Sequence, residues 1–331
     1  TTQKILQQQY VDDFSNHGML SLKSSSNFRC QYYKGKDCSS ALRELKVSKD
    51  PKFRACCGGG CVYKRAKRKF IDSPLGVTNF AYFLAETNYS QQLEPRDLLV
   101  VDEAHNIETQ LSKFVEISFS SKFAKNILKV NFPKKITQFQ MIKWVKEVYF
   151  PRAKAKMNHM ESLLEKYTSL KDKLKEFTNT MKQYEILDKH VCKINRFLEV
   201  YSQDNWVMNL TEYDSGYKIE FKPVDISPFT DDYLFSKGEK VLMMSATILN
   251  KEAFCTGLGL SMKEVAFISL SSPFPKENRP IMFFPIGSMS LKNIDNSLPK
   301  LCNAIKEILS QHKNEKGIIH CHSYNIAKYL K

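Results

Sequence analysis

The sequence predicts an α/β protein with parallel sheets, interrupted by two insertions of different kinds. Two short apolar runs, "LLVV" at 98–101 and "KVLMMSATIL" at 240–249, end in polar residues, which is typical of buried parallel strands. Between them, residues 105–200 carry apolar side chains at helical spacing and predict a long helical stretch. Residues 23–62 hold five of the nine cysteines and show weak periodicity, so we expect this segment to owe its fold to its cysteines.

The remaining elements are predicted from the same patterns along the chain. Residues 1–22 are expected to be helical, because Ile5, Leu6 and Tyr10 are spaced as on one face. Residues 160–187 contain neither Gly nor Pro and predict an αα-hairpin or a coiled-coil-like insertion. Further strands are predicted at 206–210, 217–224, 279–284 and 316–324, with a helix near 296–311. Strands that alternate with helices favour α/β layers around parallel sheets.

The bulk composition limits the function classes. A length of 331 residues is long for one compact domain and predicts two or more. The formal net charge of +15 favours an anionic partner, of which nucleic acid is the commonest. The chain has no apolar run of 18 residues, and its start lacks the apolar region of a signal peptide. We therefore expect an intracellular protein, in the cytoplasm or the nucleus, with no membrane partner.

The stretch "VVDEAHNIE" (100–108) carries the strongest chemical signal. Asp102 and Glu103 emerge at the carboxyl end of a predicted strand, the edge where open α/β sheets bind ligands. One carboxylate can hold a Mg²⁺ that bridges nucleotide phosphates, and the other can orient and deprotonate an attacking water. His105 lies one turn further on, positioned to pass the state of the site to a neighbour.

A second predicted strand end, in "MMSATIL" (243–249), carries small hydroxyl residues. Ser245 and Thr247, with Ala246 between them, can hydrogen-bond the acidic motif or the elements that face a nucleic acid. Ser-Ala-Thr follows "DEAH" after a helical insertion, and at this distance it favours an element that couples the two strand ends over a simple strand–turn.

The clustered cysteines favour a metal or iron–sulfur site in a reducing compartment, because their number is odd and there is no secretion signal. Cys61 forms a close pair with one of Cys56 and Cys57, and Cys30 and Cys38 form a wider pair. This spacing permits either structural zinc or an iron–sulfur cluster and does not choose between them. The other four cysteines are expected to be small core residues.

The residues around Cys61 suit such a site. Gly58, Gly59 and Gly60 let the backbone turn tightly, so that Cys61 can face its partners. The basic run after it is predicted to begin a helix and either to contact phosphates of single-stranded DNA or to form a solvated basic face. Its members are Lys64, Arg65, Lys67, Arg68 and Lys69.

"VVDEAHNIE" resembles motif II of the DEAH-type superfamily 2 helicases, and within them the iron–sulfur branch that contains XPD and DinG. Other stretches resemble further family segments in the family's order, so the resemblance covers nearly the whole chain. They are motif Ia (1–10), the segment before motif II with its recurring Asn (76–84, Asn79), motif III (243–249), the linker between motor domains (271–275) and motif IV (316–330).

The resemblance implies an ATP-dependent DNA helicase that translocates 5′ to 3′ on single-stranded DNA and unwinds forked DNA. In that role Asp102 would hold Mg²⁺, Glu103 would activate water, and His105, Ser245 and Thr247 would couple ATP hydrolysis to movement. It further implies a 4Fe–4S cluster held by Cys30, Cys38, Cys57 and Cys61, with Cys56 as the alternative to Cys57. The implied DNA contacts are Thr1, Thr2, Gln8, Lys64, Arg65, Lys67, Arg68 and Asn79.

The same resemblance implies a domain plan. Residues 1–22, 63–109 and 204–265 would form a first RecA-like motor domain. Residues 23–62 would be the iron–sulfur domain, and residues 110–203 a helical, Arch-like insertion. A second RecA-like domain would begin at 266 and continue to 331.

The chain also departs from the family. It contains no G-x-x-x-x-G-K-[ST] phosphate loop and no segment resembling motifs V and VI, so we expect an internal fragment that hydrolyses ATP poorly on its own. Two alternatives stay open. One is a zinc-stabilised nucleic-acid-binding module. The other is a structural subunit with an inactive motor, which would bind a protein partner through the helical insertion.

Overall fold

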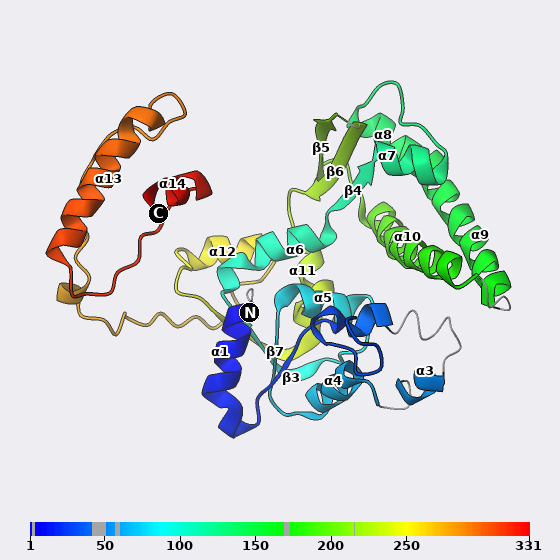
Figure 1. Ribbon diagram of the computed structural model, residues 1–331, viewed down its shortest axis with the longest axis horizontal. Helices are drawn as coiled ribbons and strands as arrows, with labels where there is room; N and C mark the ends of the chain where they lie inside the picture. Colours follow the sequence, from blue (N-terminus) through cyan, green and yellow to red (C-terminus); the bar gives the residue numbers. More distant parts are fainter. Residues whose placement is uncertain (2–3, 42–50, 57–59, 169–172, 215) are drawn as a thin grey trace. The chain divides into compact units, whose positions relative to one another are not determined.

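The computed structural model describes residues 1, 4–41, 51–56, 60–168, 173–214 and 216–331. The chain forms two compact units, Thr1–Phe267 and Ile268–Lys331. The first unit is a mixed α/β structure with two parallel strand pairs, β1–β2 and β3–β7, and one antiparallel sheet, β4–β6–β5 (Figure 1). The predicted α/β class with parallel sheets is therefore confirmed in this unit.

The central parallel pair joins β3 (Arg96–Asp102) to β7 (Gly238–Met244), with Asp102 opposite Met244. We expected both strands to be buried, and this was wrong for one face of the pair. Val101 is buried, whereas Leu98 is 54% and Leu242 is 47% exposed. Alternate residues of a strand point to opposite faces, so a layer covers only one side of this pair among the described residues.

The first helix, α1 (Lys4–Phe14), packs against the second parallel pair, β1 (Leu20–Leu22) and β2 (Gly76–Thr78). Its buried residue is polar: the Gln7 side-chain amide donates to the carbonyls of Leu22 (2.7 Å) and Val77 (3.1 Å). Ile5, which the sequence placed on the apolar face, is 75% exposed. The predicted apolar face is therefore wrong at Ile5, whereas Leu6 and Tyr10 are half-buried. The helix predicted over residues 1–22 is also wrong at its end, because Leu20–Leu22 pair with β2 as a strand.

Short helices surround these strands. The helical elements between β1 and β3 are η2 (Ser25–Asn27), α3 (Pro51–Ala55), α4 (Val62–Asp72) and α5 (Phe80–Asn88), and η1 (Ser15–His17) follows α1. The helix α5 begins at a cap, because the Asn79 side chain accepts a hydrogen bond from the Tyr82 amide at 3.0 Å. After β6, α11 (Ser227–Tyr233) and η8 (Phe235–Lys237) lead into β7, and α12 (Lys251–Gly257) follows it.

In the described residues, the predicted helical stretch is helical except for one strand and for a segment without regular structure at 129–137. It comprises η4 (Ala104–Asn106), α6 (Ile107–Val115), α7 (Ser121–Phe123), η5 (Ala124–Leu128), α8 (Gln138–Trp144), η6 (Val145–Tyr149), α9 (Phe150–Thr168) and α10 (Leu174–Val200). The helices α9 and α10 lie side by side, which confirms the predicted αα-hairpin (Figure 1). The strand is β4 (Ile117–Ser120), where the expectation of helix was wrong because these residues pair with a strand about 100 residues later.

That distant strand is β6 (Gly216–Pro223), which also pairs with β5 (Trp206–Tyr213), so the two strands predicted here are confirmed. Phe119, Trp206 and Phe221 are fully buried in one aromatic core of this sheet. The sheet joins strands from both sides of residue 203, the predicted end of the helical insertion. The domain limits themselves stay a prediction.

The second unit contains η9 (Lys276–Asn278), α13 (Ile294–Gln311) and α14 (Tyr324–Leu330). The helix near 296–311 is confirmed, but the strands expected at 279–284 and 316–324 do not form. Ile281, Phe283 and Ile318 are 96%, 86% and 95% exposed. A strand needs a neighbour for its backbone hydrogen bonds, and these segments have none in the described chain. In the whole of that described chain, we find no helix with the length and apolar character needed to cross a membrane.

Candidate functional site

The carboxyl ends of β3 and β7 bring the two predicted motifs together. Asp102 ends β3, Met244 ends β7, and the parallel register sets these two residues opposite each other. The His105 ring nitrogen Nδ1 lies 2.9 Å from the Ser245 hydroxyl, although the residues are 140 positions apart in the chain. We call Asp102, Glu103, His105, Ser245 and Thr247 the strand-edge residues.

His105 connects the acidic motif to the second strand end. The Asn106 side-chain amide nitrogen lies 2.9 Å from His105 Nε2, and an amide nitrogen only donates, so Nε2 accepts and the ring proton is on Nδ1. Nδ1 then donates toward Ser245, with a Glu103 carboxylate oxygen 3.2 Å away. The Ser245 hydroxyl in turn accepts from the Thr247 amide at 3.1 Å. Ala246 is exposed between them.

The acidic residues have a specific local backbone. Glu103 has a φ of +54°, in the left-handed region that a residue with a side chain rarely adopts, and its amide donates to Asp102 Oδ1 at 2.9 Å. Such conformations cost on the order of 1 kcal/mol and concentrate at functional sites. The turn directs the Glu103 side chain to His105 while Asp102 stays at the strand end.

Tyr10 is a site residue that the sequence did not single out as functional. It belongs to α1, and burial, followed by the negative charge of the Asp102 carboxylate nearby, raises the pKa of Tyr10. The only sequence feature that could have pointed to Tyr10 is its position on the predicted first helix. A phenol can donate to a carboxylate, so Tyr10 is close enough to influence the residue that the family resemblance assigns to Mg²⁺.

The predicted DNA contacts near the start of the chain occupy different environments. The Thr1 carbonyl accepts from the Phe80 amide at 2.9 Å, next to Asn79, whose side chain caps α5. Gln8 is exposed and donates to Asp12 at 2.9 Å. Thr2 lies outside the described residues. The structure thus brings Thr1 and Asn79 together and leaves Gln8 on an open surface of α1.

The predicted basic contacts on α4 divide into exposed and buried side chains. Arg65, Arg68 and Lys69 are exposed, and Lys64 is half-buried. Lys67 is buried and forms an ion pair with Glu86 on α5, with a second hydrogen bond to Gln92 at 2.6 Å. Its ammonium therefore fastens α4 to α5, and the open basic surface of this helix consists of the exposed residues.

A short hairpin presents the first two cysteines. Arg29 and Asp37 form an antiparallel bridge, the Cys30 amide donates to the Lys36 carbonyl at 2.9 Å, and the Cys38 amide donates to the Phe28 carbonyl at 2.8 Å. These bonds set both cysteines on one small hairpin.

Four cysteines meet in one place, which we call the cysteine cluster: Cys30, Cys38, Cys56 and Cys61. The last three are buried, and Cys30 packs against them half-buried. Cys38, Cys56 and Cys61 pack together in this cluster, so that their thiols influence one another electrostatically. Burial, followed by the charges of neighbouring groups, raises the pKa of Cys38 to about 11 and that of Cys56 to about 12. The predicted ligand Cys57 lies outside the described residues, as do Gly58 and Gly59.

The approach of Cys61 to its partners depends on Gly60. A side-chain carbon at this position would lie 2.7 Å from the Ala55 carbonyl oxygen and 2.1 Å from the Tyr32 hydroxyl. No residue other than glycine fits there without a shift of the backbone. The need for glycine is therefore observed at Gly60, whereas the predicted turn through Gly58 and Gly59 lies outside the described residues.

The donor atoms of the cysteine cluster fit an iron–sulfur group by chemistry, because all four are thiols that converge in a largely buried place. Within the described chain, however, no three His, Cys, Asp or Glu residues are arranged to hold a metal ion. The raised pKa values mean that the thiols keep their protons at neutral pH, so that binding of a metal must displace these protons.

Of the cysteines outside the cluster, Cys255 is buried as predicted, whereas Cys192 is exposed and Cys302 and Cys321 are half-buried.

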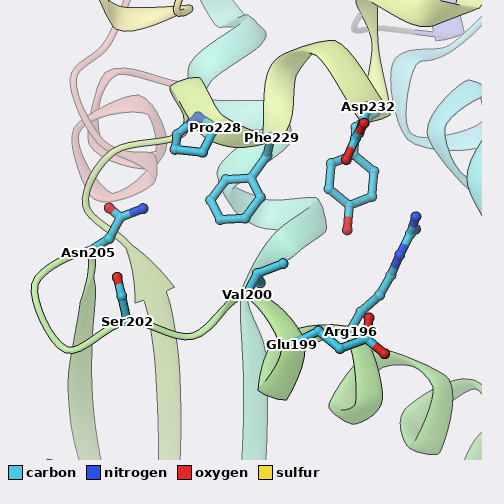
Figure 2. Close-up of a pocket in the computed structure, with 9 residues that line it drawn as sticks. Arg196, Glu199, Val200, Ser202, Asn205, Pro228, Phe229 and Asp232 are labelled. Atoms are coloured by element: carbon cyan, nitrogen blue, oxygen red, sulfur yellow. The ribbon is translucent and has the colours of Figure 1, made fainter.

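A separate cavity of about 380 Å³ lies between the end of α10 and the start of α11 (Figure 2). Arg196 and Glu199 line it from α10, and Phe229 and Asp232 from α11. The Arg196 guanidinium lies 4.7 Å from the centre of the Tyr233 ring. None of the residues predicted to be functional lines this cavity, so it belongs to neither site above.

Comparison with known proteins finds similarity to solved structures only. A truncated XPD has a TM-score of 0.43 and 16% sequence identity, over 78% of this chain and 84% of that one. XPD in its apo form has a TM-score of 0.39 and 13% identity, over 99% of this chain and 71% of that one. No protein-family model matches the chain, and neither does any curated protein.

Proposed function

We propose that the chain is part of the motor of an ATP-dependent DNA helicase, with ATP and Mg²⁺ bound at the strand-edge residues. The observation that carries the proposal is the contact between His105 and Ser245. It links an acidic strand end to a second strand end through one proton-bearing ring. A site of this kind can report the state of one strand end to the other, which is what coupling of hydrolysis to movement requires.

Each strand-edge residue has a role that suits its environment. Asp102, at the strand end, would hold the Mg²⁺, and the Tyr10 hydroxyl would orient its carboxylate. Glu103, turned outward by its left-handed backbone, would orient and deprotonate the attacking water. His105 would pass a change at Glu103 to Ser245 and Thr247.

In the same proposal, the cysteine cluster holds a 4Fe–4S group. The thiolates of Cys30, Cys38, Cys56 and Cys61 would bind it, and it would fix the cluster segment as a structural centre. This assignment takes Cys56 where the sequence favoured Cys57, because Cys56 is 2% exposed and contacts the Cys61 thiol. The residues from Arg65 to Lys69 that are exposed would contact phosphates of single-stranded DNA.

The test uses the polypeptide encoded by the complete gene, compared with its E103Q variant. We expect E103Q to lower ATP turnover in the presence of single-stranded DNA by at least about 100-fold while ATP and DNA binding persist, because it removes only the base. Turnover that is equal in the two proteins would contradict the proposal. For the 331-residue chain alone, which contains no phosphate loop, we expect little or no turnover.

A further inference from the structure

The positive charge of the chain is concentrated in one part of the helical region. Residues 121–160, which we call the basic segment, contain nine lysines and one arginine against a single acidic residue, Glu147, a net charge of +9. The next forty residues, 161–200, contain eight basic and seven acidic residues, a net charge of +1. Both halves belong to the same helical region, so its overall composition does not explain the difference.

The charges of the basic segment are open to solvent. Nine of its ten basic side chains are exposed, Lys156 being half-buried, and none of the ten has an ion pair with any residue that the structure describes. Like charges that are not neutralised repel one another and cost stability. A partner that carries regularly spaced negative charges would remove this cost.

A large aromatic side chain lies among these charges. On α8, Phe139 is 68% exposed and Lys143 follows it at position i+4, on the same face of the helix. Lys146, also exposed, lies one turn further on in η6, which continues directly from α8. The other side of α8 is fixed, because Trp144 is buried and its ring centre lies 5.0 Å from that of Phe132. The exposed ring is thus held on a packed helix with a lysine on the same face.

We propose that the basic segment is a binding surface for single-stranded nucleic acid, with phosphates on its lysines and a base stacked on Phe139. Aromatic rings that stand among cations are what sequence-tolerant single-strand binding uses, because every base has a flat face and every nucleotide a phosphate. A duplex has its bases stacked inside and offers Phe139 no such partner. This surface is additional to the DNA contacts in the proposed function, which lie on α1, α4 and α5.

The test measures binding of fluorescein-labelled oligo(dT) by anisotropy at several salt concentrations. For the variant Lys143→Gln/Lys146→Gln we expect the salt slope to fall by about 1.4, and the affinity at 0.1 M salt to fall roughly 25-fold. For Phe139→Ala we expect a loss of about tenfold, and Phe139→Trp should restore binding. A matched control, Lys182→Gln/Lys189→Gln, removes two exposed lysines from α10 and should cost less than about threefold.

A direct contact is detected by photo-crosslinking of oligo(dT) that carries 4-thiothymidine. We expect crosslinks to the peptide that contains Phe139, in the wild type and equally in E103Q, so this result does not depend on ATP turnover. Equal loss in the test and control variants, or crosslinks only at other peptides, would overturn the proposal. Poly-glutamate and a DNA duplex are tested as competitors of the labelled oligo(dT). If either competes as effectively as unlabelled oligo(dT), the proposal is overturned, because the segment then binds any polyanion. Unchanged circular dichroism and urea midpoints establish that the variants are folded.

Discussion

The strand-edge residues and the cysteine cluster are assembled in different ways. The strand edge is set by backbone pairing, since the parallel register of β3 and β7 fixes Asp102 opposite Met244 and thereby brings His105 to Ser245. The cysteine cluster is set by side chains that come from a hairpin and two later segments, and its thiols are protonated and contact one another. The side chains of the first site are positioned by the fold of the chain alone, whereas in the proposed function the second site is completed by the group that its thiols bind.

The largest expected effect separates the two adjacent cysteines at the cluster. We expect Cys56→Ser to abolish the brown colour and to lower the iron content of the protein to background, because it removes a thiolate from the buried set. Cys57→Ser should retain both. The measurement is visible absorbance with iron analysis of protein purified without oxygen. Loss of colour in Cys57→Ser alone would return the ligand role to Cys57.

The next effect concerns the contact between α4, which follows the cysteine cluster, and α5, which precedes β3. The helix α4 starts directly after Cys61, and Lys67 fixes it to Glu86 on α5. Lys67→Met should lower the free energy of unfolding by about 3 kcal/mol, because it leaves the Glu86 carboxylate with little solvent and no cation. Lys67→Met/Glu86→Gln should recover part of the loss. If urea unfolding gives the same free energy for Lys67→Met and wild type, the ion pair does not join these helices.

The third effect is a pH dependence of stability that arises at His190, in the helical region away from both sites. Burial, followed by the charge of Lys193, lowers the pKa of His190 to about 4, and its ring accepts from or donates to Tyr149 at 3.0 Å. The unfolded chain binds a proton near pH 6.5 and the folded chain does so only near pH 4, so stability falls as the pH drops through this window. We expect a loss of about 2 kcal/mol from pH 7 to pH 5 in urea unfolding.

His190→Phe is the matched variant for this effect, since it keeps the aromatic contacts with Phe119 and Tyr149. Its unfolding free energy should lose most of the pH dependence between pH 7 and pH 5. An unchanged pH dependence would assign the acid sensitivity to another group.

The smallest expected effect is at the strand edge. Ser245→Ala removes the hydroxyl that binds His105, while the backbone register remains. We expect turnover by the polypeptide encoded by the complete gene to fall about tenfold, the value of one neutral hydrogen bond, with ATP binding unchanged. Loss of folding in this variant would show that the strand edge depends on its side chains after all.

The sequence predicts the strand edge better than the cysteine cluster for a physical reason. An apolar run that ends in polar residues identifies both a strand and the end at which its functional residues lie. The sequence therefore placed Asp102 at the end of one strand and Ser245 directly after the end of another. Spacing alone cannot choose between Cys56 and Cys57, because each leaves a short loop to Cys61. The structure adds that Cys56 is buried and packs against Cys61, while Cys57 lies outside the described residues.

Other residues were missed because their environment depends on distant partners. Lys67 belongs to a basic run, yet Tyr63, Lys67 and Phe70 are spaced on one face of α4, and that face is the one that packs. The four residues of β4 gave no strand signal in a helical context, since the partner β6 follows about 100 residues later. The two strands expected in the second unit failed for the converse reason, because a strand signal without a paired neighbour forms no strand.

Amide hydrogen exchange of the iron-loaded and iron-depleted protein tests the difference between the two regions most directly. We predict that removal of iron by a chelator lowers protection in Phe28–Cys38 and in the first turn of α4, while the amides of β3 and β7 keep theirs. Equal loss of protection in both regions, or no change in either, would contradict the view that the cysteine cluster depends on its bound group and that the strand edge does not.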